Sequence, residues 1–219
     1  MTSTLLDSRV STTLDRMFAE ADAQIPKLGE MVGNAAVPPE SSAQERADAL
    51  SEFYLPVTPD AGRLLYALVR ASRPTTVVEF GMSLGISAIH LASAVRDNGA
   101  GRVVTTELNA DKVAAATRNF ADAGLDDLIT VLQGDALQTL AEVEGPIELV
   151  LLDGWKDLYV QVLDLLEPRL APGALVVADN TSMPALQPYL DYVRDPANGY
   201  VSVNFPARES DSMEISCRA

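Results

Sequence analysis

The sequence is poor in the residue types on which several classes of protein depend. A single cysteine, Cys217, excludes a disulfide within the chain and a metal site built from several thiolates. A single histidine, His90, makes a Ser-His-Asp or Cys-His catalytic arrangement implausible, and we expect it to pack within a helix. The longest uninterrupted apolar run, residues 64–69, is too short to cross a bilayer. These absences argue against a membrane-spanning, disulfide-stapled or thiolate-metal protein.

Basic residues are also scarce. Lysine and arginine number 16 against 31 aspartates and glutamates, which gives a formal net charge of -15. A nucleic acid partner requires clustered basic side chains, so this balance argues against one. The first ten residues show no basic stretch followed by an apolar core, the pattern of a secretory signal. We therefore expect a soluble cytoplasmic protein with no nucleic acid and no membrane partner.

Short apolar runs alternate with helical stretches from residue 75 onward. The expected strands cover 75–80, 102–107, 128–133, 147–153 and 174–179, and the helical stretches cover 84–97, 110–123, 136–142, 157–170 and 184–194. Alternation of this length implies a mostly parallel sheet covered on both faces. The tail, 200–205 and 212–217, has no intervening helix and predicts an antiparallel hairpin. The sequence therefore predicts an α/β fold with a doubly wound sheet.

The segment before this alternation predicts helices. The apolar residues between positions 6 and 18 recur at helical spacing and predict a helix there. Proline and glycine predict an irregular stretch over 25–42, and a short helix is expected over 43–50. A further helix is expected from residue 58 to about 71. Thr58 is suited to cap it, Pro59 to its first turn, and Asp60 to the positive end of its dipole.

An acidic residue follows each of the five apolar runs. These residues are Glu79, Glu107, Asp135, Asp153 and Asp179. In an open α/β sheet the ligand binds outside the carboxyl ends of the strands, so the five carboxylates are expected to border one crevice. Any single one could instead cap the helix that follows it, but five in succession favour a binding site.

The first turn of the predicted sheet contains Gly81 and Gly85 but lacks the third glycine of a dinucleotide fingerprint. It carries no basic residue, and the neighbouring Glu79 would repel a pyrophosphate. A cationic ligand without phosphates, such as S-adenosylmethionine, fits better than a nicotinamide dinucleotide. Glu107 is placed to accept ribose hydroxyls, while Asp135 and the backbone amide of Ala136 are placed for adenine.

Asp153, Asp179 and Asn180 form an all-oxygen set at neighbouring strand ends, of the kind that binds Mg²⁺ or another hard divalent cation. Lys156 lies three residues after Asp153 and could act as a general base. The two could equally form a local ion pair at a helix start. Trp155, the only tryptophan, could line a pocket for a flat substrate or fill space in the core.

These residues resemble those of the cation-dependent, catechol O-methyltransferase-like family of class I S-adenosylmethionine-dependent O-methyltransferases. The resemblance is carried by VVEFGMSLGISAIHLA (77–92), VVTTELNADKVAAATRNFADAG (103–124), LVLLDGWKDLY (149–159) and LVVADN (175–180). It implies a Rossmann-like methyltransferase sheet, and it covers 53–219. Residues 1–52 are then a helical cap at the substrate mouth.

The resemblance also implies a role for each matching residue. Mg²⁺ is expected on Asp153, Asp179 and Asn180, with Lys156 as the base and Trp155 against the aromatic substrate. The expected cofactor-binding residues are Val57, Glu79, Gly81, Ser87, Glu107, Asp135, Ala136 and Asp153. A substrate-binding acid near the C-terminus falls on Glu209 in an ungapped alignment, or on Asp211 if the last strand is the anchor.

The sequence departs from the family pattern at two positions. Gly154 replaces the histidine that animal catechol enzymes carry before the tryptophan, and Ile86 stands where most members have tyrosine. The expected activity is Mg²⁺-dependent methylation of a hydroxyl on a catechol-like aromatic. The alternatives are a metal-independent methyltransferase acting on another small acceptor and a non-catalytic S-adenosylmethionine-binding module. By analogy with relatives of this fold, a homodimer is also an expectation.

Overall fold

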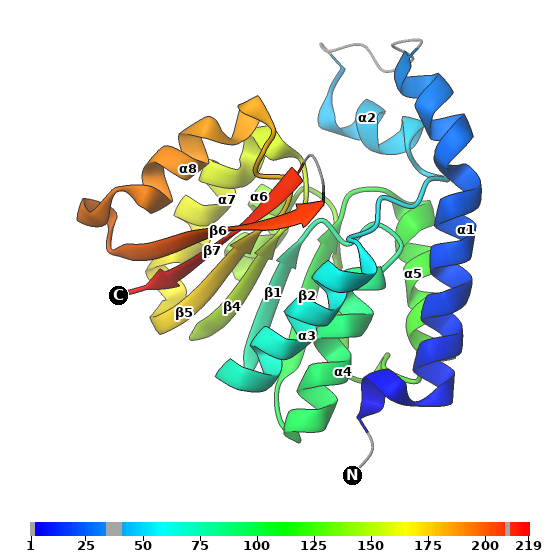
Figure 1. Cartoon of the computed structure of the whole chain (residues 1–219), viewed down its shortest axis with the longest axis horizontal. Coiled ribbons are helices and arrows are strands. Elements are labelled where there is room, and N and C mark those ends of the chain that lie inside the picture. The colour runs from blue at the N-terminus through cyan, green and yellow to red at the C-terminus, as the bar shows by residue number, and fades with distance from the viewer. Residues whose placement is uncertain (1–2, 34–40, 209–210) are drawn as a thin grey trace.

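The computed structural model describes residues 3–33, 41–208 and 211–219, and it contains one seven-stranded sheet (Figure 1). The strands run in the order β3-β2-β1-β4-β5-β7-β6. Their bounds are β1 Thr76–Phe80, β2 Arg102–Glu107, β3 Ile129–Gln133, β4 Ile147–Leu152, β5 Leu170–Ala178, β6 Tyr200–Arg208 and β7 Asp211–Arg218. The first five strands are parallel, and β7 pairs antiparallel with both β5 and β6. The predicted parallel sheet with its antiparallel C-terminal hairpin is confirmed.

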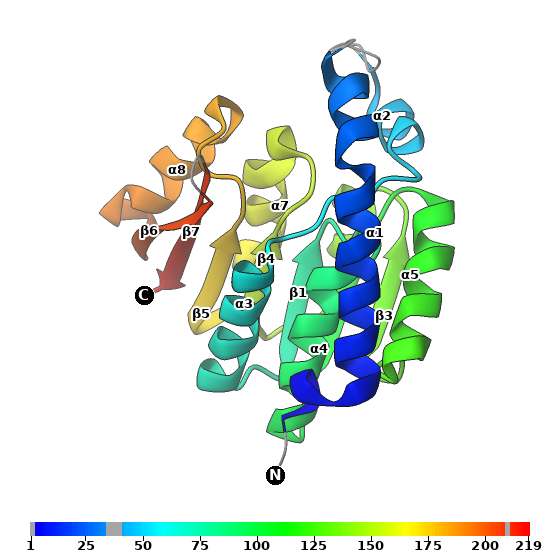
Figure 2. The same cartoon turned by 45° about the vertical axis from the view of Figure 1, so that its right-hand side comes forward.

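Helices cover both faces of the sheet (Figures 1 and 2). The α-helices are α1 Ser8–Gly33, α2 Ala43–Ala49, α3 Pro59–Ser72, α4 Ile86–Asn98, α5 Ala110–Ala123, α6 Ala136–Thr139, α7 Tyr159–Leu166 and α8 Gln187–Arg194. Short 3-10 helices lie at Thr4–Leu6, Leu140–Glu142, Lys156–Leu158, Glu167–Arg169, Pro184–Leu186 and Pro196–Asn198. In the described part of the chain, no helix is both long and apolar enough to span a membrane.

Alternate residues of each central strand enter different cores. On β1, Val77 packs with the core under α1, α3, α4 and α5, whereas Val78 packs with the core under α6, α7 and α8. On β4, Leu149 and Val150 divide in the same way. This alternation follows from the two-residue period of a strand, and it explains why the buried strands are apolar along their whole length.

The first long helix departs from the sequence prediction. Proline and glycine were expected to break any regular element from residue 25, yet α1 continues to Gly33 with Pro26 inside it. Pro26 is exposed, and the helical turn that precedes it is held by tertiary contacts of Gln24. Gln24 Nε2 donates to the Glu52 carbonyl at 2.8 Å, and the Tyr54 N–H donates to Gln24 Oε1 at 2.8 Å. Tertiary contacts of this kind override local propensity.

The other predicted elements differ from the structure mainly at their ends. Helix α3 begins as expected, with the Thr58 hydroxyl accepting from the Ala61 N–H at 3.1 Å and Pro59 in the first turn. Strand β5 begins at Leu170, earlier than the predicted 174, because its first residue already pairs with Ile147 of β4. Helix α1 contributes Val10 to the same core as the sheet. The division into 1–52 and 53–219 stays a prediction.

Candidate active site

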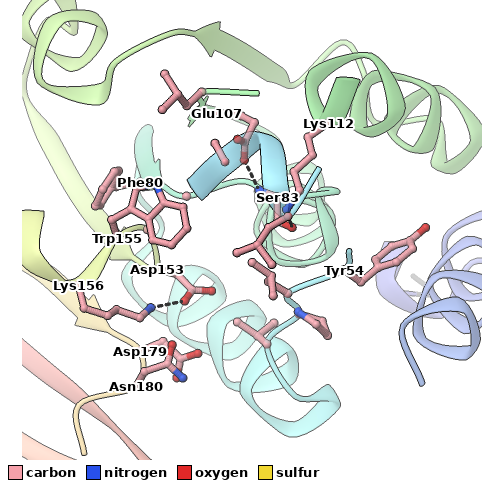
Figure 3. Close-up of a pocket in the computed structure, with 18 of the residues that line it drawn as sticks. Tyr54, Phe80, Ser83, Glu107, Lys112, Asp153, Trp155, Lys156, Asp179 and Asn180 are labelled. Atoms are coloured by element: carbon pink, nitrogen blue, oxygen red, sulfur yellow. Dashed lines mark hydrogen bonds and ion pairs between the residues drawn. The ribbon is translucent and has the colours of Figure 1, made fainter. Parts of the chain in front are cut away.

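A cavity of about 1020 Å³ lies at the carboxyl ends of the parallel strands (Figure 3). Residues at or just after the ends of β1, β2, β3, β4 and β5 form its floor, and residues of α1, α2 and the segment 54–59 form much of the remaining wall. Among the described lining residues, five are acids and two are bases: Asp22, Glu107, Asp135, Asp153 and Asp179, with Lys112 and Lys156. The expected crevice at the strand ends is therefore present, and it is lined by an excess of negative charge.

The turn after β1 approaches the loop after β4 very closely. Gly81 has φ +100°, and a Cβ there would lie 2.5 Å from the Gly154 backbone, so no larger residue fits without a shift. Gly81 and Val57 line the cavity and also a small adjoining pocket, which is lined by Ser87 as well. The structure thus brings three of the predicted cofactor-binding residues together.

Glu79 lies behind this turn rather than among the residues that line the cavity. Its side chain is 0% exposed, the Thr105 hydroxyl donates to Oε2, and Oε1 has no hydrogen-bond partner among the described residues. Burial raises the pKa of Glu79 to about 7, against the opposing effect of the Ser87 and Thr105 hydroxyls. A cationic group close to this turn would compensate the charge of the buried carboxylate.

Glu107 is held at both carboxylate oxygens. The Ser83 N–H donates to Oε2 at 2.9 Å and the Asn109 N–H donates to Oε1 at 2.9 Å. An ionised carboxylate offers about four acceptor sites, so two remain for a ligand. The geometry suits the predicted contact with a ribose.

Asp135 is exposed at the cavity and caps α6, since its Oδ1 accepts from the Leu137 N–H at 2.9 Å. Ala136 follows it as the first residue of α6 and also lines the cavity. The cap uses one carboxylate oxygen of Asp135. The same residue can therefore cap α6 and be a candidate contact for adenine.

The predicted metal ligands meet at the ends of two neighbouring strands (Figure 3). The Asp153 N–H pairs with the Phe80 carbonyl at 2.8 Å and the Asp179 N–H with the Leu152 carbonyl at 3.0 Å, which places both acids just past the sheet. Asn180 has φ +60°, a left-handed conformation that asparagine tolerates better than most residues.

Lys156 reaches back to this group. Its Nζ donates to Asp153 Oδ1 at 3.1 Å and to the Tyr159 hydroxyl at 2.9 Å, and that hydroxyl donates to the Asp179 carbonyl at 3.2 Å. The predicted ion pair between Asp153 and Lys156 is present, and it lies inside the cavity rather than on an outer surface. Burial raises the pKa of Tyr159 well above its ordinary value, so Tyr159 remains a neutral partner of the lysine.

These residues fit a hard divalent cation in their chemistry. Asp179 is 2% exposed and lies near a second carboxylate, that of Asp153 (Figure 3). A bound cation would offset the negative charge of these two groups. The amide nitrogen of Asn180 donates to Asp211 Oδ2 at 2.7 Å, which leaves its oxygen as the ligating atom. The described residues contain no group of three or more His, Cys, Asp or Glu suited to a metal, so such an ion would rest on two carboxylates and an amide.

Trp155 forms part of the cavity wall, and its surroundings explain one departure from the family pattern. The guanidinium of Arg46, on α2, lies 4.5 Å from the centre of its ring and pairs with Asp157 at 3.2 Å. A Cβ at Gly154 would lie 2.4 Å from the Phe80 ring. Phe80, which lines the cavity beside Trp155 (Figure 3), therefore occupies the space that a larger side chain at position 154 would need, and the glycine found there avoids this overlap.

The predicted substrate acid Glu209 lies outside the described residues. The alternative, Asp211, is at the start of β7, and its Oδ1 accepts from the Ser212 N–H at 2.8 Å. Its Oδ2 accepts from Asn180, so Asp211 stands next to the candidate metal ligands.

Sequence reasoning missed three side chains at this site: Lys112, Tyr54 and Arg46. The sequence does contain an indication for Lys112, because a basic residue in the first turn of a helix opposes the helix dipole and is therefore unusual there. Tyr54 and Arg46 precede the alternating region, and nothing in their spacing indicated that they would contact it.

Comparison with known proteins identifies the type of domain. A family model described as a methyltransferase domain matches residues 78–181. A catechol O-methyltransferase from Mus musculus is 31% identical over 150 residues, covering 65% of this chain and 56% of that protein. A solved O-methyltransferase from Bacillus cereus, in complex with SAH, has a TM-score of 0.68 at 22% identity and covers 84% of this chain and 93% of its own. At that identity it supports the fold alone.

The chain spans little more than half the length of the first curated relatives that it matches. Coverage is greater for the catechol O-methyltransferase from Sus scrofa, which is 31% identical over 140 residues, or 61% of this chain and 74% of that protein. The five strand-end acids and the turn that contains Gly81 and Gly85 lie within residues 78–181, which the family model matches. The chain therefore belongs to the catechol O-methyltransferase-like family of S-adenosylmethionine-dependent methyltransferases.

Proposed function

We propose that this chain transfers a methyl group from S-adenosylmethionine to a hydroxyl of a catechol-like small aromatic molecule, with Mg²⁺ bound beside the cofactor. The single observation that carries the proposal is that one cavity holds both sets of residues. Glu107 and Asp135 lie at one part of its wall, and Asp153, Lys156 and Asp179 lie at another.

The cofactor is supported by the charge and shape of the cavity. S-adenosylmethionine carries a sulfonium and no phosphate, and it would meet an acidic wall and a glycine turn without basic residues. Gly81 and Val57 would lie against its amino-acid end, Glu107 against the ribose, and Asp135 with Ala136 against the adenine. The family named above uses this cofactor, and the Bacillus cereus structure contains its demethylated product.

The chain would perform proton transfer and positioning. When bound, S-adenosylmethionine supplies an electrophilic methyl group, and Mg²⁺ supplies positive charge that stabilises a phenolate. As the neutral amine, Lys156 would accept the hydroxyl proton at Nζ while the acceptor oxygen forms its bond to the methyl carbon. The carbon–sulfur electron pair stays on sulfur, so the products are the methyl ether and S-adenosylhomocysteine. Holding the reactants in line supplies much of the rate enhancement.

Two contacts keep Lys156 in place for this step. Asp153 and Tyr159 accept from its Nζ at 3.1 and 2.9 Å, which directs the amine toward the carboxylates of the candidate metal site. Asp153 then serves both groups, as a ligand for the ion and as an orienting partner of the base. Trp155, held under Arg46, offers a flat wall for an aromatic acceptor.

The test is release of S-adenosylhomocysteine from the purified protein with a panel of catechols, in Mg²⁺ and in excess EDTA. We expect turnover that EDTA removes and Mg²⁺ restores, and none with phenols that lack a vicinal hydroxyl. Asp179→Asn is expected to lose this turnover, whereas Asp164→Asn, which changes an exposed acid on α7, is the matched control.

The second candidate is a metal-independent methyltransferase acting on another small acceptor. It is favoured by the finding that the described residues contain no group of three or more His, Cys, Asp or Glu suited to a metal. Asp153 and Asp179 would then position Lys156 and Tyr159 rather than an ion. Turnover that is unchanged by EDTA would establish this reading and overturn the metal-dependent one.

A further inference from the structure

Lys112 is a buried lysine at the edge of the cavity. It is the third residue of α5, after the cap residue Asn109, and the residue is 4% exposed. It lines the cavity, and Figure 3 shows its ammonium directed toward Ser83. Among the described residues, the ammonium has one hydrogen-bond partner, the Ser83 hydroxyl at 3.1 Å.

This placement is unfavourable for the stability of the fold. Removing an ammonium group from water costs several kcal/mol in general, and a positive charge in the first turn of a helix opposes the helix dipole. Burial accordingly lowers the pKa of Lys112, although the charge of Glu107 acts in the opposite direction. A residue that weakens the fold at a cavity wall is a candidate for a role in the site.

The contacts of Lys112 lead to the ribose-facing carboxylate. Ser83 has φ +50°, a left-handed conformation that costs free energy for a residue other than glycine. In this conformation its N–H donates to Glu107 Oε2 at 2.9 Å while its hydroxyl meets Lys112 at 3.1 Å. The lysine therefore contacts the one residue whose strained backbone holds Oε2 of Glu107.

We propose that Lys112 is a positioning residue of the cofactor pocket, which fixes Ser83 and through it orients Glu107 toward the two ribose hydroxyls. The identity of the ligand rests on the proposed function. With Oε1 held by Asn109 and Oε2 by Ser83, Glu107 presents its remaining acceptor sites in one direction. Without the lysine, Ser83 is released and Oε2 loses its fixed partner.

The experiment is calorimetric titration with S-adenosylhomocysteine and with its 2′-deoxy analogue. The proteins are the wild type, Lys112→Met and Arg118→Met, which removes an exposed charge from the same helix and serves as the matched control. For Lys112→Met we expect the Kd of S-adenosylhomocysteine to rise about tenfold, the size of one charged hydrogen bond. The preference for the ribose over the 2′-deoxyribose ligand is expected to shrink in this variant and to persist in Arg118→Met.

The preference ratio separates positioning from general stabilisation, because a looser fold would weaken both ligands equally. An unchanged ratio in Lys112→Met overturns the inference and leaves the proposed function standing. If the wild type binds neither ligand, the proposed function itself fails. Should Lys112→Met not fold, Ser83→Ala removes the same hydrogen bond, and its ratio decides in the same way. Where both fold, the double variant is expected to show the loss of either single variant, and additive losses would overturn the link through Ser83.

Discussion

Lowering the pH from 7 to 5 is expected to destabilise this protein through His90. The imidazole is 3% exposed, and its Nδ1 lies 2.8 Å from the Ile86 carbonyl, which acts as acceptor for the Nδ1 proton of the neutral ring. The other edge of the ring faces Gly62, and the Phe18 ring packs edge-on at 6.4 Å. Burial lowers the pKa of His90 to about 4, and the nearby charge of Arg63 acts in the same direction.

The sign and size follow from proton linkage. Because the folded pKa of about 4 lies below the unfolded value of 6.5, the unfolded chain binds more protons between these limits. The contribution of His90 is complete above pH 6.5 and falls as the pH drops toward 4. Between pH 7 and pH 5 the loss amounts to about 2 kcal/mol in the free energy of unfolding, and to about 3 kcal/mol at full protonation.

Two measurements check this prediction. The chain has one histidine, so the two carbon-bound protons of the imidazole report the titration of a single group in the folded protein. Urea unfolding at pH 7 and pH 5 is then compared between the wild type and His90→Asn, because the difference removes the contribution of the carboxylates. A folded-state midpoint near 6.5, or an equal loss of stability in the two proteins, would refute the reasoning.

Three further predictions concern single contacts. Gly62→Ala is expected to lower the free energy of unfolding, measured by urea titration, by about 1–3 kcal/mol, because a Cβ would lie 2.6 Å from His90 Nε2. Alanine usually stabilises a helix relative to glycine, so an increase in the free energy of unfolding would contradict this packing. Lys156→Met is expected to lower kcat about 10²–10⁴-fold with S-adenosylhomocysteine binding unchanged, and retained turnover would exclude it as the base. Arg46→Ala is expected to shift the emission of Trp155, the only tryptophan, to longer wavelength by exposing the ring; unchanged emission would contradict the stacking.

The sheet was predictable because each strand and helix repeats one pattern. Buried parallel strands are apolar runs in the sequence, glycines lie in several of the turns that connect them to helices, and the cap at Thr58 uses a standard residue order. The error at Pro26 has a different origin. Proline predicts a break from local geometry alone, and the contacts that Gln24 makes across to Glu52 and Tyr54 join residues far apart in the sequence.

The site was predictable where its residues follow strands. Glu107, Asp153 and Asp179 were placed together because the carboxyl ends of parallel strands share one edge of the sheet. Glu79 was expected beside them, but it lies at a buried position of β1, and the alternation of the strand turns it away from the cavity. The close approach of Gly154 to the Phe80 ring depends on the three-dimensional path of two loops, which no spacing in the sequence reveals.

The two parts of the cavity wall have different origins in the sequence. The glycine turn, Glu107, Asp153, Lys156 and Asn180 all lie within the segment 78–181 that matches the methyltransferase domain model. Much of the remaining wall comes from α1 and α2, outside that segment, and Arg46 holds α2 against Trp155. Under the proposed function the transfer chemistry would be the same for every acceptor, whereas the acceptor would have to fit the remaining wall, so we expect selectivity among acceptors to depend on α1 and α2. Substitutions there should change KM for the acceptor and leave cofactor binding intact.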